Sequence, residues 1–145
     1  MSFSEQADFP ARLASLPDTA AFARGFCDRH GIGHDDALKL TLIIEELFTN
    51  TIEHGYRAES DAPIRIALAL HGDAVTLLYE DSAPPYDPLS TVSAKRFALG
   101  EELETRPIGG LGVHLVRELT SDARYAYEDG SNRLWLTLKA QKANA

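Results

Sequence analysis

The segment from Glu45 to Tyr56 contains the pair of residues whose types and spacing best suit catalysis. Glu46 and Asn50 are four positions apart, so on a helix they lie on one face, about 40° apart around the axis. A carboxylate can accept a proton as a general base, and a carboxamide oxygen is a ligand that Mg²⁺ accepts. The pair therefore suits a base that works beside a metal-bound phosphate.

Two later segments suit the rest of a nucleotide site. Asp81 ends a predicted strand, where its carboxylate can accept a hydrogen bond from the adenine amino group. Gly109, Gly110 and Gly112 precede a predicted helix, and glycines there let backbone N–H groups approach phosphates. Each feature alone is more simply structural, but all of them in this order predict ATP binding. The chain has no GxxxxGK(S/T) motif, which excludes a P-loop.

The elements expected to position these residues begin near the N-terminus. Phe9–Ser15 alternates weakly between apolar and polar residues and is predicted as an opening strand. Leu16–Asp18 suits the first turn of a helix, because proline and an acidic residue are favourable there. Gly31 and Gly33 are predicted to end that helix.

A second predicted helix, from about Asp35 to Glu53, carries Glu46 and Asn50. Its apolar stripe recurs at helical spacing and consists of Leu40, Ile43, Ile44, Leu47 and Thr51. With steps of about 100° per residue, Glu46 and Asn50 flank this stripe on one side and Glu45 lies on the other. Glu46, rather than Glu45, is therefore expected to act with Asn50.

The second half of the chain predicts strands and a third helix. Alternating apolar residues predict two hairpins, formed by Pro63–Leu70 with Val75–Glu80, and by Arg124–Glu128 with Arg133–Lys139 through a turn at Asp129–Asn132. Gly110–Thr120 has the spacing of a helix. This order predicts an α+β two-layer sandwich, in which a mixed, mainly antiparallel sheet carries about three helices on one face. Residues 1–145 are expected to form a single domain.

Composition limits the kinds of partner. The net charge of −8 argues against a nucleic-acid partner bound through its phosphates. No apolar run reaches the roughly 20 residues that a membrane span needs. Cys27 is the only cysteine, which excludes a disulfide within the chain and fits a cytoplasmic protein. Cys27 lies in an apolar helical pattern, so a buried, unreactive thiol is predicted.

Three blocks of the sequence resemble the motifs of one protein family. Glu46–Tyr56 resembles its N box, Glu80–Pro88 its first glycine box in a Pro-Pro-aromatic-Asp-Pro form, and Ile108–Val116 its second glycine box. By these blocks the chain is similar to the anti-sigma-factor serine kinases. They are small members of the ATPase superfamily that also contains gyrase and sensor histidine kinases. The resemblance implies the Bergerat fold of that superfamily, in agreement with the predicted sandwich.

The resemblance also implies a role for each matching residue. Glu46 is implied to be the catalytic general base, Asn50 the Mg²⁺ ligand and Asp81 the partner of adenine. The other implied nucleotide-binding residues are Ala83, Arg106, Gly109, Gly110 and Gly112, with an ATP lid at about residues 89–108 before the glycines. Ala83 stands where the family usually has glycine, and a positive φ there would cost an alanine roughly 1 kcal/mol.

The implied activity is phosphorylation of a serine or threonine on a small anti-sigma-factor antagonist, with ATP and Mg²⁺. The resemblance also implies binding of a sigma factor and a homodimer, but no contact with membrane or nucleic acid. The alternative is a non-catalytic module that sequesters a partner in response to nucleotide. Glu46 favours the kinase and Ala83 the alternative. A sensor histidine kinase is not expected, because the sequence shows no upstream helical hairpin with a phospho-accepting histidine.

Overall fold

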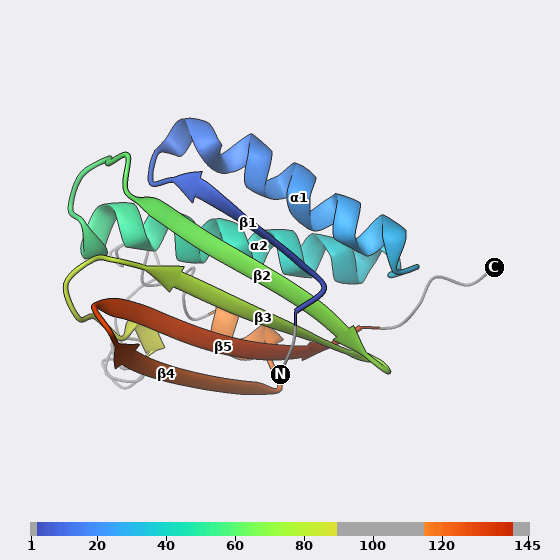
Figure 1. Ribbon diagram of the computed structural model, residues 1–145. Coiled ribbons are helices and arrows are strands. Elements are labelled where there is room, and N and C mark those ends of the chain that lie inside the picture. Colours follow the sequence, from blue (N-terminus) through green and yellow to red (C-terminus); the bar gives the residue numbers. More distant parts are fainter. Residues whose placement is uncertain (1–2, 90–114, 141–145) are drawn as a thin grey trace, which may run out of the picture.

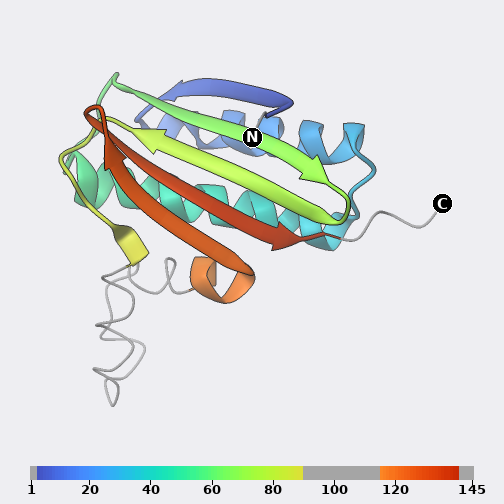
Figure 2. The ribbon, with the colours of Figure 1, turned by 60° about the horizontal axis from the view of Figure 1, so that its bottom comes forward.

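An antiparallel sheet of five strands, with helices on one face, forms the protein (Figure 1, Figure 2). The computed structural model describes residues 3–89 and 115–140. The strands are β1 (Glu5–Pro10), β2 (Pro63–His71), β3 (Ala74–Asp81), β4 (Asp122–Glu128) and β5 (Ser131–Lys139). Their order is β1-β2-β3-β5-β4, and each neighbouring pair is antiparallel. The predicted α+β sandwich is confirmed, although the sheet expected to be mixed is antiparallel throughout the described residues.

Two long helices cover one face of the sheet. Helices α1 (Leu16–Arg29) and α2 (His34–Asn50) pack against each other behind the strands in Figure 1. Helix α2 continues into a π-helical turn, η2 (Thr51–Gly55). Residues 115–119 are also helical and contribute the buried Val116 to the core. The first two predicted helices are therefore present, and the third is present over the part of its range that the structure describes.

The opening strand differs from the prediction. Strand β1 precedes most of the expected range Phe9–Ser15, and Leu13–Ser15 forms a 3-10 turn, η1. The Pro10 carbonyl accepts a hydrogen bond from the Ser15 hydroxyl at 2.8 Å, so the chain turns directly after Pro10. The sequence pattern misplaced this strand because only two of its residues, Ala7 and Phe9, are apolar and face the core, which is a short alternating signal and suits an edge strand.

The apolar stripe of α2 packs on the inward face of the sheet. Its residues Leu40, Ile43, Ile44 and Leu47 are at most 1% exposed. The strand register places the inward side chains of the central strands in rows, such as Leu68, Leu77 and Leu136. All of these residues belong to one core. This packing confirms the predicted stripe and sets the rotation of α2, and with it the directions of Glu46 and Asn50.

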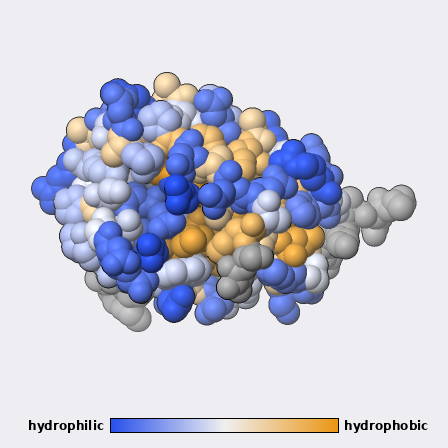
Figure 3. Space-filling model, viewed as in Figure 1, coloured by the Kyte–Doolittle hydropathy of each residue, from blue (hydrophilic) through white to orange (hydrophobic). Residues whose placement is uncertain are grey.

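The opposite face of the sheet is not covered by the described helices (Figure 1). By strand alternation and register, Ala67, Leu78 and Trp135 lie side by side on this face. The Arg124 guanidinium lies over the Trp135 ring, 4.1 Å from its centroid. Figure 3 shows apolar surface over the middle of this side of the molecule, bordered by polar side chains.

Cys27 is buried, as predicted, with 1% of its surface exposed. Burial, together with the nearby charges of Asp28 and Asp36, raises the pKa of the Cys27 thiol to about 11. The thiol therefore stays protonated at neutral pH, the unreactive form. Within residues 3–89 and 115–140, no helix combines the length and the apolar composition that a membrane crossing requires.

The turn between β4 and β5 determines the position of Asn132. Asp129 and Gly130 have φ values of 53° and 77°, as in a two-residue type I′ turn. The sequence prediction extended this turn to Asn132, but β5 begins at Ser131. Asn132 therefore lies in the strand and pairs with Asp81, the last residue of β3. The Asp-Gly dipeptide is the sequence signal that would have placed Asn132 there.

Candidate functional site

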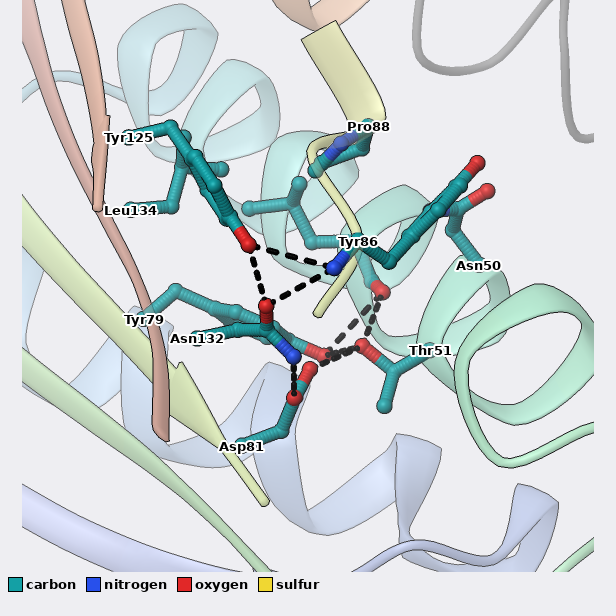
Figure 4. Close-up of a pocket in the computed structure, with 10 residues that line it drawn as sticks. Asn50, Thr51, Tyr79, Asp81, Tyr86, Pro88, Tyr125, Asn132 and Leu134 are labelled. Atoms are coloured by element: carbon teal, nitrogen blue, oxygen red, sulfur yellow. Dashed lines mark hydrogen bonds between the residues drawn. The ribbon is translucent and has the colours of Figure 1, made fainter. Parts of the chain in front are cut away.

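A pocket lies between the end of α2, the ends of β3 and β5, and the segment after β3 (Figure 4). Its lining consists of Leu47, Asn50, Thr51, Tyr79, Asp81, Tyr86, Pro88, Tyr125, Asn132 and Leu134. The pocket thus brings together two of the predicted site residues, Asn50 and Asp81. Its free volume of about 20 Å³ has room for about one water molecule. A purine ring therefore enters only if lining side chains move.

The Asp81 carboxylate is 8% exposed, and most of its acceptor positions are occupied. Oδ1 accepts hydrogen bonds from the Asn132 side-chain nitrogen at 2.9 Å and from the Ala83 N–H at 3.1 Å. Oδ2 accepts one from the Thr51 hydroxyl at 3.0 Å. A carboxylate offers about four acceptor positions. Within the described residues, one position is therefore left, and it belongs to Oδ2.

A buried pair of hydroxyl groups supports Asp81. The Tyr79 hydroxyl lies 2.6 Å from Thr51 Oγ1 and 3.0 Å from the Leu47 carbonyl oxygen. Burial, and then the charge of Asp81, raises the pKa of the Tyr79 phenol well above its usual value, so the phenol stays a donor. Thr51 has one hydroxyl proton, so when it donates to Asp81 it accepts from Tyr79. Thr51 also begins the π-helical turn η2, a distortion frequent at functional sites.

Asn132, which the sequence interpretation missed, ties the segment after β3 to the sheet. Its side-chain nitrogen lies 3.0 Å from the Ala83 carbonyl oxygen and 3.1 Å from that of Pro84. Its side-chain oxygen accepts hydrogen bonds from the Tyr86 N–H, at 3.0 Å, and from the Tyr125 hydroxyl. Asn132 is only 7% exposed, so these bonds hold it in a buried position.

Ala83 adopts an unstrained backbone conformation. Among the described residues, the only non-glycine residues with positive φ are Arg57 and Asp129, so the cost expected for alanine does not arise. Ala83 is 1% exposed, and a Cβ placed on Gly55 would lie 3.2 Å from the Ala83 methyl carbon. The absence of a side chain at Gly55 therefore makes room for this methyl group. Ala83 is not among the lining residues of the pocket and contributes through its backbone bonds.

Asn50 has the properties of a residue that serves a ligand. It ends α2, lines the pocket and is 4% exposed. Its carboxamide makes no hydrogen bond to another residue in the described ranges. No buried side-chain nitrogen or oxygen in these ranges lacks a partner, so the carboxamide atoms of Asn50 reach the surface of the pocket. In the same ranges, no group of three or more His, Cys, Asp or Glu residues could hold a metal ion. A neutral oxygen such as that of Asn50 fits Mg²⁺, whose other ligands are commonly waters and phosphates.

Glu46 lies one helical turn before Asn50 and is half-buried, outside the lining of the pocket. Burial raises the pKa of the Glu46 carboxyl, and the negative charges of Glu45 and Glu53 raise it further. A carboxylate with a raised pKa is a better proton acceptor than an ordinary one. Glu46 therefore has the chemistry, and through α2 the proximity to Asn50, that a general base requires.

The predicted phosphate-binding part of the site lies outside the described residues. It consists of Arg106, Gly109, Gly110, Gly112 and the predicted lid from residue 90 onward. Leu89, the first residue of the predicted lid, is 6% exposed and belongs to the hydrophobic core. The described pocket therefore represents the end of the site where a nucleotide base is expected.

Most of the chain matches one protein family. Residues 9–138 match the histidine kinase-like ATPase domain. The chain belongs to this family. This ATPase domain is 26% identical over 125 residues to the serine-protein kinase RsbW of Listeria monocytogenes serotype 4a (strain HCC23), which covers 82% of the chain and 79% of that relative. It is 27% identical over 123 residues to RsbW of Bacillus mycoides (strain KBAB4), covering 83% and 76%. The predicted resemblance to small serine kinases of this superfamily is confirmed.

Solved structures share the fold of this ATPase domain. The RsbU and RsbW domains of Rv1364c from Mycobacterium tuberculosis align with a TM-score of 0.64 and 21% identity, over 97% of this chain and 34% of that one. The SiaB–SiaC complex from Pseudomonas aeruginosa aligns with a TM-score of 0.57 and 14% identity, over 94% and 89%. The catalytic domain of the histidine kinase ThkA aligns with a TM-score of 0.51 and 16% identity, over 93% and 95%. At these identities the likeness shows the fold alone.

Proposed function

We propose that this ATPase domain is an ATP- and Mg²⁺-dependent serine/threonine protein kinase that phosphorylates a small anti-sigma-factor antagonist in the cytoplasm. The observation that carries the proposal is the meeting of Asp81 and Asn50 in one pocket. Asp81 has an acceptor position left for an adenine amino group, and Asn50 presents a carboxamide without a partner in the described residues. The similarity to the RsbW serine-protein kinases supports the same activity.

In the proposed reaction, Glu46 accepts the proton of the substrate hydroxyl as the hydroxyl oxygen attacks the γ-phosphorus of ATP. The new O–P bond forms while the bond from the γ-phosphorus to the bridging oxygen breaks, and ADP leaves. Asn50 would hold Mg²⁺, which neutralises phosphate charge when bound. Arg106 and the glycines Gly109, Gly110 and Gly112 are proposed to contact the phosphates. Phosphoryl transfer relies mainly on positioning and charge, so this set of residues suffices.

This domain is also proposed to bind other proteins. We assign to this domain an antagonist as phosphate acceptor, a sigma factor as a second partner, and pairing with another copy of the chain. SiaB, which shares the fold, has been solved in a complex with SiaC, and this supports a fold of this kind holding a protein partner. Light scattering of the isolated chain, and of its mixtures with each candidate partner, with and without ATP, measures these associations.

Asn50→Ala is expected to remove the Mg²⁺-dependent part of ATP binding. Calorimetry on the wild type should show tighter ATP binding with Mg²⁺ than in EDTA, because Asn50 then shares the metal with the phosphates. The variant should lose at least about tenfold in affinity with Mg²⁺, the equivalent of about 1.4 kcal/mol, and little in EDTA. Asn50→Asp keeps an oxygen ligand and is the matched control. An Asn50→Ala variant with the Mg²⁺ dependence of the wild type would contradict the assigned role.

The small pocket favours a second candidate function. A free volume of about 20 Å³ fits a module that binds its protein partner without nucleotide. Ala83 no longer supports this alternative, since its backbone carries no positive φ. Wild-type protein that binds neither ATP nor ADP, with and without Mg²⁺, would establish the module. ATP binding followed by transfer of the γ-phosphate to an acceptor protein would establish the kinase.

As the pH is lowered, the rate of phosphoryl transfer is expected to fall earlier, at a higher pH, than it would with a glutamate of ordinary pKa as the base. The pKa of Glu46 is raised above 4.5, so protonation removes the base while the solution is still less acidic than that value. Removing a neighbouring negative charge lowers this pKa. Glu45→Gln should therefore shift the acid limb of the pH–rate profile to lower pH. Asp73→Asn, an equal charge change at the other end of β3, should leave the limb unchanged. Equal shifts in both variants would contradict Glu46 as the titrating base.

A further inference from the structure

The hydrogen bonds around Asp81 also restrict which nucleotide base can donate hydrogen bonds to its carboxylate. Oδ1 is filled by two protein donors, the Asn132 amide and the Ala83 N–H, whereas Oδ2 receives only the Thr51 hydroxyl. One acceptor position is left, and it belongs to Oδ2. A base that offers one N–H group to Asp81 is therefore satisfied, but a base that offers two adjacent N–H groups is not.

Adenine and guanine differ in this respect. Adenine presents its amino group beside the acceptor N1, whereas guanine presents N1–H and its amino group side by side and pairs with both oxygens of a free carboxylate. In this pocket the second guanine donor would face an Oδ1 whose positions are filled. A buried donor left unpaired weakens binding by about 5- to 150-fold.

The surroundings of Asn132 determine which end of its amide faces Asp81. The Tyr86 N–H, at 3.0 Å, and the Tyr125 hydroxyl both contact the side-chain oxygen of Asn132. The side-chain nitrogen is directed to Asp81 and to two backbone carbonyls. A flipped amide would set its donor against the Tyr86 N–H and its oxygen against the carboxylate. Figure 4 shows this chain of contacts from Tyr125 through Asn132 to Asp81.

We propose that Asn132 is a specificity-determining residue that makes the site select adenine over guanine by filling Oδ1 of Asp81. This inference rests on the proposed function, in which Asp81 binds the base of a nucleotide. Without the Asn132 amide, Oδ1 keeps the bond from the Ala83 N–H and Oδ2 keeps the bond from Thr51. Asp81 then offers one acceptor position on each oxygen, which is the arrangement that guanine needs.

Calorimetric titrations of ATP, GTP and ITP, with Mg²⁺, test the proposal on the wild type and on Asn132→Ala. Hypoxanthine lacks the second donor of guanine, so the wild type should bind ITP at least about fivefold more tightly than GTP. It should also bind ATP more tightly than GTP. In Asn132→Ala, GTP should gain at least about fivefold relative to ATP, and the difference between ITP and GTP should disappear.

Arg133→Gln is the matched control. Arg133 follows Asn132 in β5 but lies outside the pocket lining, and its guanidinium pairs with Glu80. The variant keeps the bond from Asn132 to Asp81, so the ATP/GTP ratio should stay at the wild-type value. Thermal unfolding shows whether each variant is folded. If Asn132→Ala is not folded, the comparison of ITP with GTP on the wild type tests the proposal by itself.

Three results would overturn the inference alone: a folded Asn132→Ala variant with the wild-type ratio, an equal loss of selectivity in Arg133→Gln, or wild-type protein that binds GTP as tightly as ITP. Wild-type protein that binds no nucleotide overturns the proposed function and the inference with it.

Discussion

Replacing Glu46 with glutamine is expected to reduce phosphoryl transfer by at least about 100-fold, the usual contribution of a general base, while ATP affinity changes little. Glutamine preserves the shape of the side chain but cannot accept the substrate proton. Glu46 lies one turn from Asn50 and does not line the pocket where the nucleotide base is expected. The loss should therefore appear in the transfer rate and not in nucleotide binding. The transfer rate is measured by following labelled γ-phosphate from ATP to an acceptor in a lysate of the source cells. The ATP affinity is measured by calorimetry.

Glu45→Gln provides the matched control for this experiment. It makes the same chemical change at the adjacent position, on an exposed residue at the other flank of the apolar stripe. Near neutral pH this variant should transfer phosphate at close to the wild-type rate. If Glu46→Gln retains wild-type transfer, or if both variants lose it equally, Glu46 is not the base. Loss of ATP binding in Glu46→Gln would indicate a structural role instead.

Asp81→Asn is expected to weaken ATP binding by at least about tenfold while the fold is kept. The amide oxygen of the new side chain can take the place of Oδ1 and accept from Asn132 and from the Ala83 N–H. Its NH₂ group then replaces Oδ2 and faces the adenine amino group, so that a donor meets a donor. Thr51 loses little, because its hydroxyl also lies 3.1 Å from the Leu47 carbonyl oxygen. Calorimetry with ATP measures the loss.

Asp81→Ala separates the structural role of Asp81 from its binding role. Alanine leaves the buried Ala83 N–H without its acceptor, so the free energy of unfolding should fall by about 1–3 kcal/mol. Denaturant unfolding should show this loss for Asp81→Ala and a smaller one for Asp81→Asn. ATP affinity of the wild-type value in a folded Asp81→Asn variant would show that Asp81 does not bind the base.

Local periodicity predicted much of this molecule from the sequence. The stripe from Leu40 to Leu47 is buried as expected, because residues spaced by three and four positions share one face of a helix whatever else surrounds them. The same rule separated Glu46 from Glu45 before any fold was known. The two hairpins were also predicted, since alternation and turn residues act over a few neighbouring positions. Strand β1 was misplaced because only Ala7 and Phe9 in it are apolar and face the core, so the alternating signal is short.

The tertiary structure decided which distant side chains meet. Asn132 lies 51 positions from Asp81, and only the pairing of β3 with β5 brings its amide to that carboxylate. The bond between Tyr86 and Tyr125 likewise joins two segments with no relation in the sequence pattern. The sequence by itself determined the two main helices, the two hairpins, the apolar stripe and the candidate residues Glu46, Asn50 and Asp81, because those follow from short-range spacing. The occupied acceptors of Asp81 and the small pocket depend on strand register and packing, which join residues far apart along the chain.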